Sequence, residues 1–153
     1  MLFYLDSSAW VKRHFQELVS EWINRQFEQE ILLGGSTLGL IEVTAACGRK
    51  RGAGAIDAVR FQQIEAGLLD DWNGFFQVHL TADVVERSLD LAKAGALRGA
   101  DSVHLASALV LKQELELDSR EFTLVTSDGE LKAAARNAGL AVIDPQQQAD
   151  TAA

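Results

Sequence analysis

Apolar residues form short runs along the chain, and segments with helical periodicity separate them. The first run, residues 2–5, holds four apolar residues in succession, as expected for a strand covered on both faces of a parallel sheet. A run at residues 122–126 combines aromatic and β-branched side chains, which favour strands. We predict strands within residues 2–5, 30–35, 75–80, 122–126 and 140–143.

Helical patterns fill the segments between these strands. Ser7 or Ser8 is the expected N-cap of the first helix, and Ser36 or Thr37 that of the third. Strands that alternate with helices predict a three-layer α/β/α domain with a central parallel sheet. We expect this domain to span residues 1–145, followed by a flexible polar tail at 146–153. The predicted helices cover residues 8–15, 20–29, 36–48, 55–69, 81–94, 102–117 and 130–137.

Composition narrows the class of protein. A chain of 153 residues corresponds to one domain, and its single cysteine, Cys47, excludes an internal disulfide and the usual multi-cysteine zinc sites. No signal peptide and no apolar run of about 20 residues is evident, so we expect a cytoplasmic protein without a membrane segment. The net charge of −8 argues against strong, generic affinity for nucleic acid and is compatible with cation binding.

Four carboxylates stand in unusual places. Asp6 and Asp128 each end an apolar strand and precede a helix, so parallel neighbouring strands would bring both to the same edge of the sheet. Glu42 has apolar neighbours within a predicted helix, and Asp101 opens a strongly apolar one. Each acid also has an ordinary structural explanation, as a helix cap, a turn residue or a surface partner of a basic side chain.

If these four acids lie close together in the folded protein, their chemistry changes. Two carboxylates about 4 Å apart repel by roughly 4 kcal/mol at an effective dielectric constant of about 20. Four such groups need protons or a cation, and oxygen ligands of this kind suit Mg²⁺ or Mn²⁺. Such a site activates water for phosphoryl displacement.

The four acids lie in four blocks of sequence: residues 4–9 (Tyr-Leu-Asp-Ser-Ser-Ala), 40–43 (Leu-Ile-Glu-Val), 97–108 (Leu-Arg-Gly-Ala-Asp-Ser-Val-His-Leu-Ala-Ser-Ala) and 125–131 (Val-Thr-Ser-Asp-Gly-Glu-Leu). These blocks resemble the motifs of PIN-domain proteins, and in particular those of the VapC-type ribonuclease toxins of bacterial toxin–antitoxin pairs. The resemblance extends over nearly the whole chain.

This resemblance implies a PIN-like fold, Mg²⁺- or Mn²⁺-dependent cleavage of RNA, and inhibition by a cognate antitoxin protein. Ser8 departs from the pattern, because many members carry Asn at this place. The family's acidic quartet, both catalytic and metal-binding, falls on Asp6, Glu42, Asp101 and Asp128, and its supporting hydroxyls fall on Thr126, Ser127 and Ser7.

Other residues are candidates for binding a partner. Lys12, Arg13 and Arg98 are the basic residues that we expect to meet RNA phosphate, although each also fits a solvated surface position. His104 lies one turn from Asp101, where it either orients that carboxylate, reaches the substrate or packs as a neutral core residue. We also predict a homodimer, with an interface that uses the N-terminal helices and residues 55–69; its aromatic surface would come from Trp10, Trp22 and Phe61.

Two alternative functions remain at this point. A receiver-like or haloacid-dehalogenase-like phosphoryl-transfer domain also places acids at strand ends, but Ser8 stands where a dehalogenase-type site would have an acid or Thr. A PIN-type module that binds without catalysis is the second alternative, and the intact set of four acids argues against it.

Overall fold

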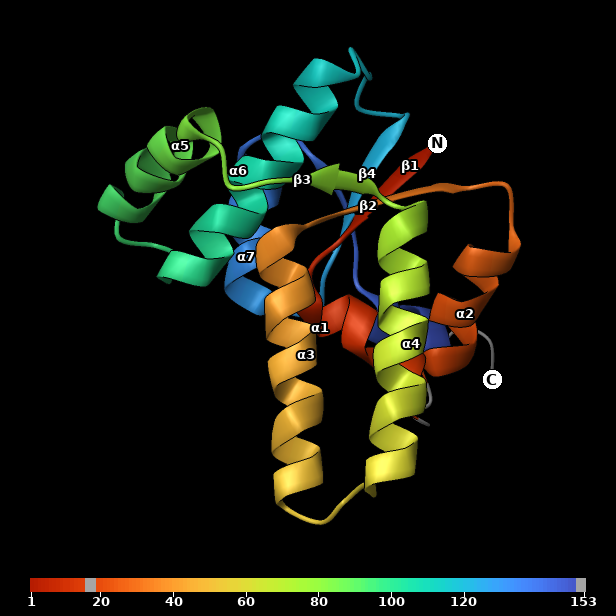
Figure 1. The fold of residues 1–153 in the computed structure, drawn as a ribbon. Coiled ribbons are helices and arrows are strands. Elements are labelled where there is room, and N and C mark those ends of the chain that lie inside the picture. Colours follow the sequence, from red (N-terminus) through yellow and green to blue (C-terminus); the bar gives the residue numbers. More distant parts are fainter. Residues whose placement is uncertain (16–18, 151–153) are drawn as a thin grey trace.

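The computed structural model describes residues 1–15 and 19–150. A five-stranded sheet, all parallel and ordered β3-β2-β1-β4-β5, forms the middle layer (Figure 1). The three-layer α/β/α fold predicted from the sequence is confirmed. The strands are β1 (Leu2–Leu5), β2 (Leu32–Ser36), β3 (Phe76–Val78), β4 (Phe122–Val125) and β5 (Ala141–Ile143).

Helices connect successive strands and cover both faces of the sheet (Figure 1). Helix α8 takes up the first part of the segment for which we predicted a tail, and residues 151–153 lie outside the described residues. The helices are α1 (Ser7–Trp10), the 3₁₀ helix η1 (Val11–His14), α2 (Ser20–Glu28), α3 (Thr37–Gly52), α4 (Ala58–Gly74), α5 (Ala82–Lys93), α6 (Gly99–Glu114), α7 (Gly129–Asn137) and α8 (Pro145–Asp150). None of them, within the described part of the chain, is long and apolar enough to cross a bilayer.

Strand β1 supplies the centre of both halves of the core. Leu2 and Tyr4 pack on one side with residues of α5, α6 and α7, while Phe3 and Leu5 pack on the other with residues of α1, α2, α3 and α4. Successive side chains of a strand point to opposite faces, so an uninterrupted apolar run is what a doubly covered strand requires. All four residues are at most 7% exposed.

Two glycines, Gly34 and Gly35, lie inside β2. A Cβ atom on Gly34 would lie 2.8 Å from Leu111 Cδ2 and 3.2 Å from the Phe76 carbonyl oxygen. A Cβ on Gly35 would lie 3.1 Å from the ring of Phe75. These glycines therefore allow close approach of α6 and of the neighbouring strand rather than a turn.

Helix boundaries differ from the predicted ones mainly at caps. Asp6, rather than Ser7 or Ser8, is the N-cap of α1. Helix α6 begins earlier than predicted, at Gly99, so Asp101 lies within its first turn instead of capping it. Helix α4 begins later than predicted, at Ala58 after the cap Asp57, and runs on to Gly74.

Asp71 joins the N-terminal helices to α4. This carboxylate is 8% exposed and accepts hydrogen bonds from Trp10 Nε1 and Arg13 Nε, each at 3.0 Å. His14 Nε2 lies 3.2 Å from the same carboxylate. Since Trp10 is fully buried, the prediction that it supplies surface to a dimer interface is wrong.

Candidate active site

Asp6 lies directly after the central strand and is 3% exposed. Its Oδ1 accepts a hydrogen bond from Ala9 N at 2.9 Å, and Thr126 Oγ1 donates to Oδ2 at 2.5 Å. The Ser8 hydroxyl lies 2.8 and 2.9 Å from the two carboxylate oxygens. Burial raises the pKa of Asp6, and these hydrogen bonds oppose that rise because they favour the charged form.

Ser8 and Thr126 also link the turn after β1 to the turn after β4. Ser127 donates its backbone N–H to Ser8 Oγ at 3.0 Å, and Asp128 donates its own to Thr126 Oγ1 at 3.0 Å. Thr126 therefore lies between the first and last acids of the predicted quartet. Ser8, the departure from the family pattern, makes a direct contact to Asp6 that the sequence did not reveal.

Arg98 brings together the acids of α6 and α7. Its Nε lies 3.4 Å from Asp101 Oδ2, and a terminal guanidinium nitrogen lies 3.4 Å from Asp128 Oδ2. Asp128 also caps α7, since its Oδ1 accepts from Leu131 N at 2.8 Å. Burial, and then the negative charge of Asp128, raise the pKa of Asp101, while Arg98 opposes this rise. Mutual repulsion between the two acids is thus part of the electrostatics of the site.

Glu42 is held by a different set of residues. Its Oε1 lies 2.6 Å from His104 Nε2, and His104 Nδ1 lies 3.2 Å from the hydroxyl of the fully buried Tyr4. The hydrogen bond from His104 lowers the pKa of Glu42, and one from Ser7 adds to this effect. Of the roles considered for His104, the structure supports orientation of a carboxylate, but that carboxylate is Glu42 instead of Asp101.

The three predicted phosphate-binding residues occupy different environments. The Arg13 guanidinium pairs with Asp71, donates to Asn24 Oδ1 at 3.0 Å and lies 3.8 Å from the centre of the Phe27 ring. Lys12 lies in η1 and is half-buried. Among these three, Arg98 is the residue whose guanidinium contacts the acids.

The residue types at this edge suit a hard divalent cation, because their ligand atoms are carboxylate oxygens. The side chains as placed do not yet form a ligand cage: within residues 1–15 and 19–150, no three His, Cys, Asp or Glu side chains are arranged to hold a metal ion. Arg98 and His104 engage carboxylates that an ion would need. Binding of Mg²⁺ or Mn²⁺ to these oxygen donors would require both contacts to rearrange.

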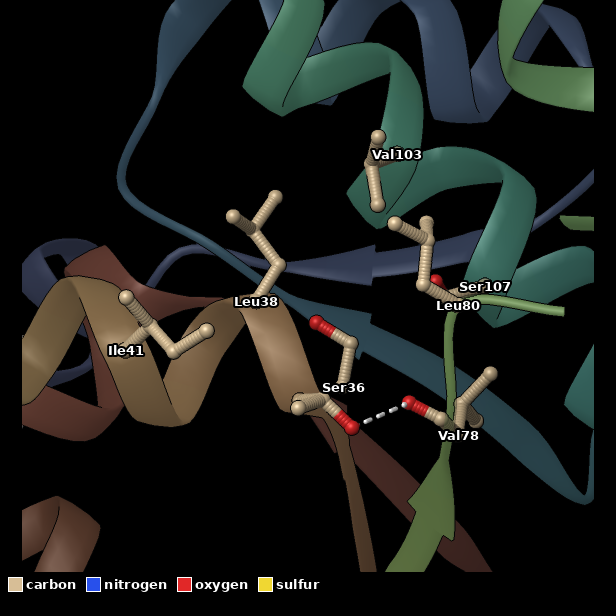
Figure 2. A pocket seen from close by; sticks show the side chains of 8 residues that line it. Ser36, Leu38, Ile41, Val78, Leu80, Val103 and Ser107 are labelled. Carbon is tan, nitrogen blue, oxygen red and sulfur yellow. Dashed lines mark hydrogen bonds between the residues drawn. The ribbon is translucent and has the colours of Figure 1, made fainter. Parts of the chain in front are cut away.

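A small apolar pocket lies beside this edge of the sheet (Figure 2). Its cavity volume is about 120 Å³, and Ser107 contributes a buried hydroxyl to its lining. Ile41 and Val103 of the lining lie next to Glu42 and two residues after Asp101, respectively. The remaining lining residues are Ser36, Thr37, Leu38, Val78 and Leu80.

A parallel sheet in the order β3-β2-β1-β4-β5, with Asp6 and Asp128 after two adjacent strands, gives the chain a PIN-type fold. It is 38% identical over 117 residues to the ribonucleases VapC45 and VapC49 of two strains of Mycobacterium tuberculosis, covering 72% of this chain and 76% of each relative. The chain belongs to the VapC ribonuclease family. No family model matches it.

Solved structures share the fold at lower identity. VapC20 of Mycobacterium tuberculosis, described as a sarcin–ricin loop cleaving toxin, superposes with a TM-score of 0.62 at 15% identity, over 86% of this chain and 94% of that one. The FitAcB structure from Neisseria gonorrhoeae gives a TM-score of 0.63 at 16% identity, over 94% and 98% of the two chains. VapBC2 of Rickettsia felis, solved with a promoter DNA fragment, gives 0.60 at 14% identity, over 94% and 98%.

Proposed function

We propose that this protein is a Mg²⁺- or Mn²⁺-dependent endoribonuclease, acting in the cytoplasm as the toxin of a toxin–antitoxin pair. The observation that carries the proposal is the network in which Thr126 connects Asp6 to Asp128 while Arg98 connects Asp128 to Asp101. Membership of the VapC family supports RNA as the substrate.

The acids have separate tasks in this proposal. Asp6 is fixed by Ser8, Thr126 and a backbone N–H, so its carboxylate keeps one orientation at the end of β1. Asp101, in the first turn of α6, and Asp128, the N-cap of α7, would hold the ion together with Asp6. When bound, the ion supplies an activated water and stabilises the negative charge of an in-line displacement at phosphorus.

Glu42 is suited to remain ionised during this reaction, because the hydrogen bond from His104 lowers its pKa. An ionised carboxylate can only accept hydrogen bonds, so His104 Nε2 is the donor to Glu42, and the Tyr4 hydroxyl lies 3.2 Å from the other ring nitrogen. Glu42 would thus complete the set of carboxylates around the ion and accept hydrogen bonds from its water.

Two kinds of protein partner are part of the proposal. One structural neighbour is a toxin–antitoxin complex from Klebsiella pneumoniae, which supports a cognate antitoxin for this chain. A homodimer remains our prediction, supported by Val59 and Leu69 on α4, which are 63% and 51% exposed. Trp22 and Phe61, half-buried, are the aromatic residues left to contribute. Light scattering at micromolar concentration that detects only a species of about 17 kDa would reject the dimer.

The direct test is cleavage of a labelled RNA by the purified protein with Mn²⁺, with Mg²⁺ and with EDTA. We expect cleavage only with a divalent ion, and its loss in Asp6→Asn. Glu130→Gln serves as the matched control, because Glu130 is exposed and lies two residues from Asp128.

Two outcomes would favour the alternatives. Mn²⁺ binding without cleavage of any RNA would support a binding module, and phosphorylation of Asp6 by a small phosphoryl donor would support a phosphoryl-transfer domain. Cleavage that persists in EDTA would refute metal dependence.

A further inference from the structure

The Arg98 guanidinium lies between two acids of the site, but its side chain is exposed and its contacts to them are long. Its side chain is 76% exposed, whereas those of Asp101 and Asp128 are 12% and 25% exposed. Both contacts measure 3.4 Å, longer than the roughly 2.7–2.9 Å of a strong charge-assisted hydrogen bond. Exposed ion pairs of this kind contribute little individually, so a competing cation can displace the guanidinium.

A divalent ion would compete for the same atoms. Arg98 contacts the Oδ2 oxygen of both Asp101 and Asp128, and an ion held by these residues needs carboxylate oxygens from each. The guanidinium and the ion also repel each other when both are close to the acids. Binding of the ion and the inward position of Arg98 are therefore mutually opposed.

The release of Arg98 has a consequence for the substrate. The protein carries a net charge of −8, which disfavours the approach of RNA. Arg98 lies immediately before α6, as its N-cap residue, and makes no side-chain capping bond that would retain it. A released guanidinium at this position would lie beside the acids and could contact an RNA phosphate by two hydrogen bonds.

We propose that Arg98 has two working positions: without metal it bridges Asp101 and Asp128, and with metal it swings outward and binds a phosphate of the RNA. This inference rests on the proposed function. It makes Arg98 a substitute cation that keeps the two acids together before the metal arrives, and a substrate-binding residue afterwards. The side chain thereby couples metal binding to RNA binding.

The test measures Mn²⁺ binding by calorimetry without RNA, in wild type, Arg98→Gln and Arg98→Lys. Loss of two exposed pairs predicts an Mn²⁺ affinity about two- to tenfold higher in Arg98→Gln, an effect that shrinks as salt is raised. Arg98→Lys, a point charge that cannot bridge two acids equally well, should fall between the two. Arg120→Gln is the control, because Arg120 is 93% exposed and pairs with Asp118 alone among the described acids.

A second measurement follows RNA binding in saturating Mn²⁺ by stopped-flow fluorescence, within a time too short for cleavage. We expect Arg98→Gln to bind the RNA several-fold more weakly, although the variant binds the ion more tightly. These opposite directions separate the proposal from simple misfolding, which would weaken both.

The outcomes distinguish the two proposals. Equal or weaker Mn²⁺ binding in Arg98→Gln, with normal binding in wild type, overturns the role of Arg98 and leaves the proposed nuclease intact. Unchanged RNA affinity in this variant overturns the outward position. Failure of wild type itself to bind Mn²⁺ overturns the proposed metal dependence and, with it, this inference.

Discussion

Substitution of Thr126 tests how the site is held together, because its single hydroxyl forms hydrogen bonds with both Asp6 and Asp128. It donates to Asp6 Oδ2 at 2.5 Å and accepts from the backbone N–H of Asp128 at 3.0 Å, and the residue is fully buried. Thr126→Val keeps the shape of the side chain and removes both hydrogen bonds. The change therefore isolates polar contributions from packing.

The expected cost follows from these two contacts. A hydrogen bond to an ionised carboxylate contributes about 1.5–3 kcal/mol, and a buried N–H left without a partner costs about 1–3 kcal/mol. A methyl group in place of the hydroxyl returns about 0.8 kcal/mol. We expect a net loss of about 2–4 kcal/mol in the free energy of unfolding, which for a domain of this size lowers Tm by about 5–15 °C.

The loss of stability in Thr126→Val should be larger at higher pH. Because burial raises the folded-state pKa of Asp6, the stability of wild type falls as the pH rises through that pKa. The Thr126 hydroxyl favours the charged carboxylate, so its removal costs most where Asp6 is ionised. The difference between Thr126→Val and wild type should therefore be larger at pH 8 than near pH 4.

The assay is thermal unfolding in EDTA across this pH range, with Thr123→Val as the control. Thr123 is a buried threonine on β4, three residues before Thr126, which directly follows that strand. Equal losses in the two variants, or a loss for Thr126→Val that does not change with pH, would refute the argument that Thr126 acts through Asp6.

Three further predictions address other parts of the molecule. Asp101→Asn should raise Tm in EDTA by a few degrees at pH 8 and little near pH 4, because the raised pKa of Asp101 means that its ionised form costs stability; RNA cleavage with Mn²⁺ should be lost, and an unchanged Tm or retained cleavage would contradict this. Tyr4→Phe should lower the free energy of unfolding in urea by about 1–3 kcal/mol, because it leaves the buried His104 Nδ1 without the hydroxyl that lies 3.2 Å away; an unchanged free energy of unfolding would contradict this contact. Asp71→Asn should lower the free energy of unfolding in urea by about 3 kcal/mol, since it leaves a partly buried Arg without its charge partner, but it should not alter Mn²⁺ affinity; a matching loss of affinity would mean that the two regions are coupled.

The sequence predicted those features of the fold and the candidate site that depend on local residue patterns. The apolar run of β1 predicts a doubly covered strand because each of its faces meets a helical layer. Asp6 and Asp128 follow adjacent parallel strands, so their approach at one edge follows from topology alone. The fold and the edge that carries the site were therefore predictable from the order of strands and helices.

The spacing of residues along the sequence could not predict contacts between segments that are far apart in the chain. Glu42 and His104 are 62 residues apart, and neither has a neighbour in sequence that indicates the other. The spacing of Arg98 and Asp101 permits a contact on one helix turn, but the second contact, to Asp128, depends on how α7 packs beside α6. Ser8 was visible only as a departure from a pattern, because its hydrogen bonds require the turn after β4.

The close approach at Gly34 has a consequence for how the site can fail. The atom that a Cβ at this position would strike is Leu111 Cδ2, and Leu111 lies on α6, the helix that also carries Asp101 and His104. Gly34, which has no side chain, thus sets how closely α6 packs against the sheet. A larger residue at Gly34 would therefore disturb activity without replacing any candidate site residue, and a screen for loss of toxicity should recover Gly34 among its inactivating positions.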